Sequence, residues 1–198
     1  MKDLNKNQKI GVISLIIAIS GIFGWIYEFI FYYFNGGMKE FYMQGGNFLP
    51  WINIYAIGAI LILIFTKKMH DNPVLVFISS ILITGLLEYF SGLAIYKLLG
   101  ARYWDYNTEI LNFGNIGGFI CLRSVLFFGL SSLILVYIIL PMCINIAKKM
   151  KTKTFLIISL ALVSIILFDE IYNLVFTKIF NLPSATKIYE SLGFKYVK

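Results

Sequence analysis

The chain has 198 residues, of which 59% are hydrophobic and 14% are charged, and its mean hydropathy is +0.81. A typical soluble domain carries about 25% charged residues, so this composition excludes an ordinary soluble protein and indicates an integral membrane protein. The net charge of +7 comes mainly from basic residues in short loops, which argues against a nucleic-acid groove and favours topology signals and contact with anionic lipid.

Five apolar stretches predict membrane-spanning helices, because about 20 apolar residues cross the hydrocarbon core. They cover residues 10–34, 51–66, 74–99, 120–146 and 155–180. We therefore expect an all-α integral membrane protein, in which residues 1–198 form one membrane domain with a five-transmembrane-helix bundle. The second stretch is short, and Pro50 suits the first turn of its helix. The first lacks a small-residue cleavage site, so we expect it to be retained.

A short tail follows the fifth stretch, at residues 184–198. Apolar and charged residues alternate along this tail in a way that is typical of an amphipathic segment. We expect it to lie on the outer membrane surface.

The basic residues predict the orientation of the chain through the positive-inside rule. Nine lysines precede the first stretch, lie between the second and third stretches, or lie between the fourth and fifth: Lys2, Lys6, Lys9, Lys67, Lys68, Lys148, Lys149, Lys151 and Lys153. The remaining loops balance their basic residues with acids: Lys39 and Arg102 against Glu40, Asp105 and Glu109. We expect a multi-pass protein of the plasma membrane with a cytoplasmic N-terminus and an extracytoplasmic C-terminus.

Three apolar stretches carry carboxylates at matching depth: Glu28, Glu88 and the pair Asp169 and Glu170. A charge inside a membrane helix costs several kcal/mol unless it faces protein or water. In the predicted orientation all of them belong to the outer half of the membrane. The pattern predicts a shared, outward-facing polar site inside the bundle.

At 100° per residue, glycines fall on the same helix face as each glutamate. Gly21 and Gly24 share the face of Glu28, and Gly85 and Gly92 share the face of Glu88. Small residues mark close helix approach in membranes, so both glutamates are expected to face neighbouring helices. In the alternative interpretation, each glutamate bonds a Tyr, an Asn or the backbone and only locks the bundle.

Arg123, near the outer start of the fourth stretch, is the expected counter-ion of a carboxylate, or it reaches lipid headgroups. In the fifth stretch we favour Asp169 over Glu170 as the inward residue, because Asn173 follows one turn later on the same face.

Two long loops are expected to cap this site from outside. The loop at residues 100–119 contains Arg102, Trp104 and Asp105 among flexible glycines. These residues either form a re-entrant cap over the polar site or anchor the loop in the membrane interface. The loop at residues 35–50 has the same character.

Two segments resemble two others along the chain. GIFGWIYEFIF aligns with LITGLLEYFSG, and FLPWINIYAIGA aligns with FICLRSVLFFGL. The alignment indicates either two parallel helix hairpins of the kind that transporters contain, or the similar composition of apolar segments.

The runs GWIYE, FLPWINIYAIG, LLEY, GARYWDY and ICLRSVLFFGL occur in this order between Gly24 and Pro141. They resemble the bacterial family of putative ABC-transporter permeases, type IV. The family-like positions are Gly24, Trp25, Glu28, Pro50, Tyr55, Gly58, Glu88, Tyr89, Arg102, Trp104, Asp105, Tyr106, Cys121 and Leu122. The chain departs from the family pattern at Asn53, at Ala56 and at Gly118-Phe119.

The resemblance implies the membrane component of a transporter that a separate ATPase subunit drives. The chain has no GxxxxGK[ST] run, so we do not expect it to hydrolyse ATP itself. Its two cysteines, Cys121 and Cys143, belong to no CxxC or Cys/His cluster, so neither a metal site nor a cofactor is expected.

The favoured hypothesis is a transport subunit, working as an oligomer or with partner chains, that binds a small polar or cationic solute. Its expected binding residues are Glu28, Glu88, Arg102, Trp104, Asp105, Arg123 and Asp169. A second hypothesis is a membrane-embedded enzyme acting on a lipid-linked substrate, although the sequence shows no nucleophile with a base. A third is a structural or regulatory partner without ATPase coupling.

Overall fold

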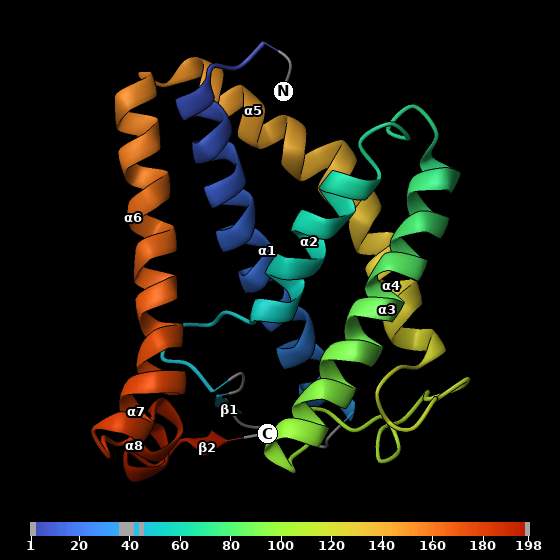
Figure 1. The fold of residues 1–198 in the computed structure, drawn as a ribbon, viewed down its shortest axis with the longest axis vertical. Coiled ribbons are helices and arrows are strands. Elements are labelled where there is room, and N and C mark those ends of the chain that lie inside the picture. Colours follow the sequence, from blue (N-terminus) through green and yellow to red (C-terminus); the bar gives the residue numbers. More distant parts are fainter. Residues whose placement is uncertain (1–2, 36–41, 44–45, 197–198) are drawn as a thin grey trace. The chain divides into compact units, whose positions relative to one another are not determined.

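The computed structural model describes residues 3–35, 42–43 and 46–196, and these residues are mainly helical (Figure 1). The α-helices are α1 (Lys6–Asn35), α2 (Asn53–Phe65), α3 (Pro73–Leu99), α4 (Leu122–Ile134), α5 (Leu140–Lys149), α6 (Thr152–Ile171), α7 (Thr177–Ile179) and α8 (Ala185–Ser191). A π-helical turn at Leu135–Ile139 joins α4 to α5, and another at Tyr172–Phe176 joins α6 to α7.

Four continuous helical segments are long and apolar enough to cross a membrane: Lys6–Phe34, Pro73–Leu99, Leu122–Lys149 and Thr152–Ile179. They correspond to four of the five predicted stretches, which confirms a multi-pass, α-helical membrane protein. The remaining predicted stretch, residues 51–66, contains the 13-residue helix α2. At about 1.5 Å per residue, α2 is about 20 Å long, shorter than the hydrocarbon core, so a fifth crossing stays a prediction.

The ends of these helices follow from local sequence. Asn5 and Gln8 exchange hydrogen bonds between side chain and backbone N–H at the start of α1, which is a capping box. The Asn72 side chain accepts from two backbone N–H groups of α3, and Pro73 stands in its first turn. Gly100 ends α3 in the left-handed conformation, at φ +67°, as glycine does most readily.

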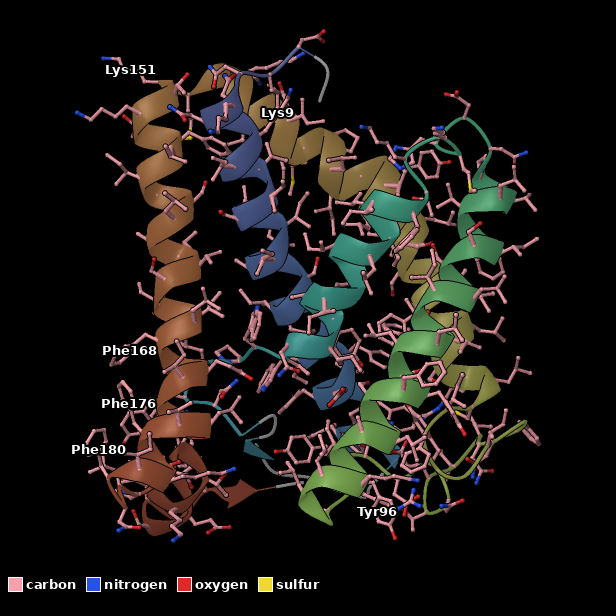
Figure 2. The ribbon with its side chains drawn as sticks, viewed as in Figure 1. Lys9, Tyr96, Lys151, Phe168, Phe176 and Phe180 are labelled. Carbon is pink, nitrogen blue, oxygen red and sulfur yellow. The ribbon has the colours of Figure 1, made fainter. Side chains whose placement is uncertain are left out.

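The chain divides into two compact units: residues 1–56 with 143–198, and residues 57–142. In the first unit, α1 and α6 start at the same end and pack side by side, so they run parallel (Figure 1). Figure 2 shows Lys9 and Lys151 at this common end. The Gln8 side chain donates to the Ala147 carbonyl of α5, 2.8 Å away. A parallel course is what the predicted topology requires of the first and last helices.

A non-helical segment in the first unit, residues 46–52, reaches the middle of α1. The Trp51 indole N–H donates to the Ile17 carbonyl at 3.2 Å, and the Ile52 N–H donates to the Gly21 carbonyl. Ile17 and Gly21 lie near the centre of the 30-residue helix α1. Because the segment stays non-helical to this depth, α2 begins at Asn53. The expectation that Pro50 opens the helix is therefore wrong.

The tail forms the short helix α8 and the two-residue strand β2 (Lys195–Tyr196), which pairs in parallel with β1 (Tyr42–Met43). Ala185 is fully buried, and the Tyr189 hydroxyl donates to the Phe48 carbonyl at 2.8 Å. The tail thus packs on residues 46–49. Its predicted place at the membrane surface stays a prediction, and Lys39 and Glu40 of the preceding loop lie outside the described residues.

In the second unit, α3 and α4 are antiparallel and tightly packed. A Cβ built on Gly85 of α3 would lie 3.3 Å from Val125 of α4, and a Cβ on Gly129 of α4 would lie 2.7 Å from Phe77 of α3. The glycines let the two backbones approach closely, as small residues do in membranes. This packing decides which polar side chains meet between α3 and α4.

Candidate functional site

Glu88 of α3 is buried, with 4% of its surface exposed. Its two carboxylate oxygens accept one hydrogen bond each, from the Tyr106 hydroxyl and from the Ser124 hydroxyl, both at 2.7 Å. Tyr106 belongs to the loop between α3 and α4, and Ser124 to the first turn of α4. Three separate segments therefore enclose one carboxylate.

Arg123 stands beside this carboxylate and forms an ion pair with Glu109 of the same loop. Its guanidinium carbon lies 5.5 Å from the centre of the Tyr106 ring, within cation–π range. Burial, and then the negative charge of Glu88, raise the pKa of Tyr106 well above its usual value, so its hydroxyl stays protonated and donates. The sequence predicted a carboxylate partner for Arg123, and that partner is a loop residue.

The other predicted loop residues build the scaffold of this site. Arg102 donates to the Gly117 carbonyl at 2.8 Å, and its guanidinium lies over the Phe119 ring at 4.5 Å. The Trp104 indole donates to the Phe119 carbonyl at 3.0 Å, and Asp105 accepts from the Asn107 backbone. These contacts lie between loop groups, so they hold the loop that brings Tyr106 to Glu88.

Gly118 shows why this loop needs glycine. Its φ is +82°, a backbone conformation that side chains other than glycine rarely adopt, and a Cβ there would collide with Arg102, Asp105 and Asn107.

Glu28 of α1 lies in the other unit and has a different partner. The Tyr55 hydroxyl of α2 donates to Glu28 at 3.0 Å, and the Tyr55 ring lies over Gly24, one turn earlier on α1. The expected link between a glycine face and a helix neighbour is present here. The absent side chain at Gly24 is what lets the tyrosine lie flat and reach Glu28.

Asp169 and Glu170 of α6 hold the non-helical segment of residues 46–52 and the start of α2. The buried Asp169 accepts from the backbone N–H groups of Phe48 and Leu49, at 3.0 and 2.7 Å. Glu170 accepts from the side chains of Asn47 and Asn53, each at 2.7 Å. Three donors from this segment and one from the first residue of α2 therefore end on two adjacent carboxylates.

Asn173 completes this second cluster. Its side chain donates to Asp169 at 2.8 Å and accepts from the Ala185 N–H of α8, also at 2.8 Å. This is the neighbour that the one-turn spacing predicted for Asp169. The asparagine ties the carboxylate to the tail of the chain.

The structure thus gathers Glu88, Arg102, Trp104, Asp105 and Arg123 within one unit, and it places Glu28 and Asp169 in the other, each with its own partners. A single site that contains all three helix carboxylates stays a prediction. Sequence reasoning missed several residues that complete the clusters: Asn47, Asn53, Glu109, Ser124 and Asn173's partner Ala185. These residues are recognised only from their contacts with segments that are distant in the chain.

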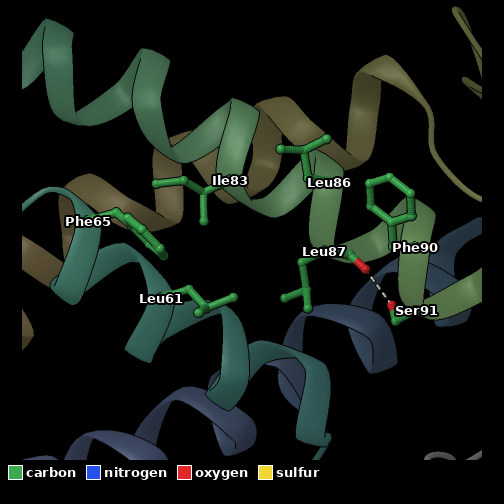
Figure 3. Close-up of a pocket in the computed structure, with 7 residues that line it drawn as sticks. All are labelled: Leu61, Phe65, Ile83, Leu86, Leu87, Phe90 and Ser91. Carbon is green, nitrogen blue, oxygen red and sulfur yellow. Dashed lines mark hydrogen bonds between the residues drawn. The ribbon is translucent and has the colours of Figure 1, made fainter.

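An apolar cavity of about 450 Å³ lies between α2 and α3 (Figure 3). Its lining is Leu61, Phe65, Ile83, Leu86, Leu87, Phe90 and Ser91. Ser91 is the polar residue of this lining, and its hydroxyl already donates to the Leu87 carbonyl. Such a surface suits acyl chains rather than a charged solute.

Among the described residues, no group of three or more His, Cys, Asp or Glu side chains is placed to hold a metal ion. Phe168 of α6 and Phe180, directly after α7, are among the many large apolar side chains that are exposed (Figure 2). Such exposure is what lipid contact requires.

The fold and these clusters together define the class of protein. It is a multi-pass helical membrane protein in which the carboxylate side chains of three helices are hydrogen-bonded to neighbouring segments. Residues 15–174 match the family described as "Putative ABC-transporter type IV" (ABC_trans_CmpB), so the chain belongs to this family. The match confirms the resemblance seen in the sequence motifs. No curated protein and no solved structure matches this chain.

Proposed function

We propose that this chain is the membrane subunit of a transporter and that it binds a small cationic or polar solute at Glu88. Membership of an ABC-transporter family supports the transport role. The carboxylate of Glu88, buried in a membrane helix and enclosed by a loop, supports the choice of site. In the proposed orientation this loop faces outward, so the solute would arrive from the extracytoplasmic side.

The charge balance around Glu88 favours a cation. Its described hydrogen-bond partners, Tyr106 and Ser124, are neutral donors, and the adjacent Arg123 is paired with Glu109. A buried negative charge is stabilised by a positive one in a medium of low dielectric constant. A cationic group that displaced one hydroxyl donor would supply this charge.

The remaining predicted residues take supporting parts in this proposal. Arg102, Trp104 and Asp105 hold the loop that covers Glu88, and movement of this loop would open the site. Glu28 and Asp169 would provide further acidic positions if the two units place them along the same path.

Binding can be tested with purified protein in nanodiscs and a defined set of probes: tetramethylammonium, choline, spermidine and arginine, with glucose and succinate as uncharged and anionic controls. At least one cation should raise the melting temperature of the wild type. Glu88→Gln should remove this shift and still fold, because glutamine keeps an acceptor and the side-chain shape. Glu190→Gln removes one exposed carboxylate and serves as the matched control.

Equal stabilisation of the wild type and Glu88→Gln by every cation would exclude Glu88 as the binding group. The proposed coupling to an ATPase has its own test, which is purification from native membranes in mild detergent. Recovery of this chain without any ATPase would contradict that part of the proposal.

One observation favours a second candidate, a structural or regulatory role. Both oxygens of Glu88 already accept strong hydrogen bonds, and these bonds alone could specify how α3, α4 and the loop pack. In that case Glu88→Gln should lower the melting temperature strongly, and no cation should stabilise the wild type.

A further inference from the structure

A row of polar residues follows the Glu88 face of α3. Ser80, Thr84 and Glu88 are spaced four residues apart, and their exposed fractions are 0, 0 and 4%. α4 contributes two further buried hydroxyls, Ser124 and Ser132. These five residues are called the α3–α4 seam below. Four hydroxyl groups and one carboxylate are therefore buried within this helix pair.

One hydroxyl in the seam lacks a partner. Thr84 donates to the Ser80 carbonyl and Ser132 to the Gly129 carbonyl, whereas the Ser80 hydroxyl has no hydrogen-bond partner among the described residues. A buried hydroxyl without a partner is costly, and ordered water is the usual partner of such groups. The fully buried Ser80 side chain therefore marks a water site on the Glu88 face of α3.

The spacing of the seam suits a file of water molecules. Four helical residues rise about 6 Å, and two hydrogen bonds of about 2.8 Å through one water span nearly the same distance. A water at Ser80 can thus reach Thr84, whose oxygen keeps lone pairs to accept from it. A second water can continue from Thr84 to Glu88.

The two ends of the seam differ. On the loop side, Glu88 faces the Tyr106 hydroxyl, and beyond it lies the ion pair of Arg123 with Glu109. At the other end, the Tyr137 hydroxyl, about one turn beyond Ser132, donates to the His70 carbonyl at 2.9 Å. His70 also lies 3.3 Å from the Thr66 hydroxyl. The loop side thus ends at the Tyr106 hydroxyl, which is both a donor and an acceptor and can relay a proton to or from Glu88, and the opposite side ends near a titratable histidine.

We propose that the α3–α4 seam conducts protons between Glu88 and the end of α3 near His70, through ordered water anchored by Ser80. Each transfer moves a proton from one water to the Glu88 carboxylate while the next water replaces that proton. No electron transfer or co-reactant is needed. The inference deepens the proposed function, since Glu88 would exchange its proton for the cationic solute.

The test uses the full chain in vesicles of phosphatidylethanolamine and phosphatidylglycerol that contain the pH dye pyranine. A potassium gradient with valinomycin drives protons inward. The wild type should acidify the vesicles faster than protein-free vesicles do. Ser80→Ala should slow this flux about fivefold or more, and Glu88→Gln should abolish it. Ser91→Ala is the matched control, because Ser91 lies on α3 outside the seam and already bonds the Leu87 carbonyl.

No flux above protein-free vesicles, or equal flux in the wild type and Ser80→Ala, would overturn the proposal. A comparable loss in Ser91→Ala would also contradict it, because the effect would not belong to the seam. Thermal unfolding provides a second readout. If the seam is dry, Ser80→Ala removes an unsatisfied hydroxyl and should raise the melting temperature. If the seam holds water, the same substitution removes a hydrogen bond and should lower it.

The result can be separated from the proposed solute binding. Ser80→Ala should still be stabilised by the same cation as the wild type, because Ser80 does not contact Glu88. Loss of proton flux with intact cation binding supports the seam. Intact flux without any cation binding would leave the seam standing and refute the solute site.

Discussion

Two glycines of α1 show how single residues decide the packing around Glu28. A Cβ at Gly21 would collide with the Trp51 indole, and one at Gly24 would collide with the Tyr55 ring. In contrast, a Cβ at Gly58 of α2 would lie 3.6 Å or more from its neighbours, which is ordinary contact. The same substitution should therefore have opposite effects at these positions.

We predict that Gly24→Ala lowers the free energy of unfolding by about 1–3 kcal/mol, the usual cost of overpacking, and breaks the bond from Tyr55 to Glu28. Gly58→Ala should be neutral or stabilising, because alanine favours helix. Melting temperatures of both variants in one detergent check this. Equal melting temperatures for the two variants would show that Tyr55 does not pack on Gly24.

Asp169 is a second residue with a defined structural role, because its carboxylate accepts hydrogen bonds from two backbone N–H groups of residues 46–52. Asp169→Ala should leave both donors without an acceptor, at about 1–3 kcal/mol each. Glu170→Gln is the control, because it keeps one acceptor oxygen and removes the acceptor of a single asparagine side chain, while both backbone N–H groups keep Asp169. We expect faster limited proteolysis near Phe48 only in Asp169→Ala, and similar cleavage of both variants would refute this role.

His70 connects stability to pH. Burial lowers the pKa of His70 below its usual 6.5, so the unfolded chain binds a proton more readily than the folded chain. Stability should therefore fall as the pH drops below about 6.5. We predict that the melting temperature falls less between pH 7.5 and pH 5.5 in His70→Gln than in the wild type. Identical pH dependence would mean that His70 titrates alike in both states.

The segment at residues 46–52 explains why α2 is short. Polar groups of a non-helical backbone must find partners when they lie at membrane depth. Asp169 supplies acceptors for Phe48 and Leu49, and the Trp51 indole bonds the Ile17 carbonyl in the centre of α1. The segment can thus stay non-helical beside the two long helices, and the helical part of this stretch is reduced to Asn53–Phe65.

Trp51→Phe tests this arrangement, because phenylalanine fills most of the space over Gly21 but lacks the indole N–H. We expect a loss of about 0.5–1.5 kcal/mol, the net value of one hydrogen bond. Gly21→Ala in the same assay should cost more, since it displaces the whole ring. A stability of Trp51→Phe equal to that of the wild type would show that the bond to Ile17 contributes nothing.

For the whole molecule, the proposed orientation can be tested with introduced cysteines, because the native Cys121 and Cys143 are both buried. A membrane-impermeant maleimide should label Phe113→Cys, in the exposed α3–α4 loop, on intact cells. Lys68→Cys, in the loop between α2 and α3, should be labelled only after permeabilisation. The reverse pattern would invert the topology, and labelling of both on intact cells would exclude a crossing between them.

Local sequence was sufficient for much of this architecture. Hydrophobic runs predicted the four long helices to within four residues, because helix length must match the membrane. The shared face of Gly24 and Glu28 also followed from helical period. The motifs between Gly24 and Pro141 were specific enough to indicate the family. In all these cases the information lies within one segment or in the order of segments.

The partners of the carboxylates depended on the folded chain. Which hydroxyl meets Glu88, which loop acid pairs with Arg123, and which backbone groups end on Asp169 are set by contacts between segments 14 to 121 residues apart. Helical period gives the direction of a side chain but does not name the residue that it faces. For the same reason the non-helical course of residues 46–52 could not be predicted before its contacts with α1 and α6 were known.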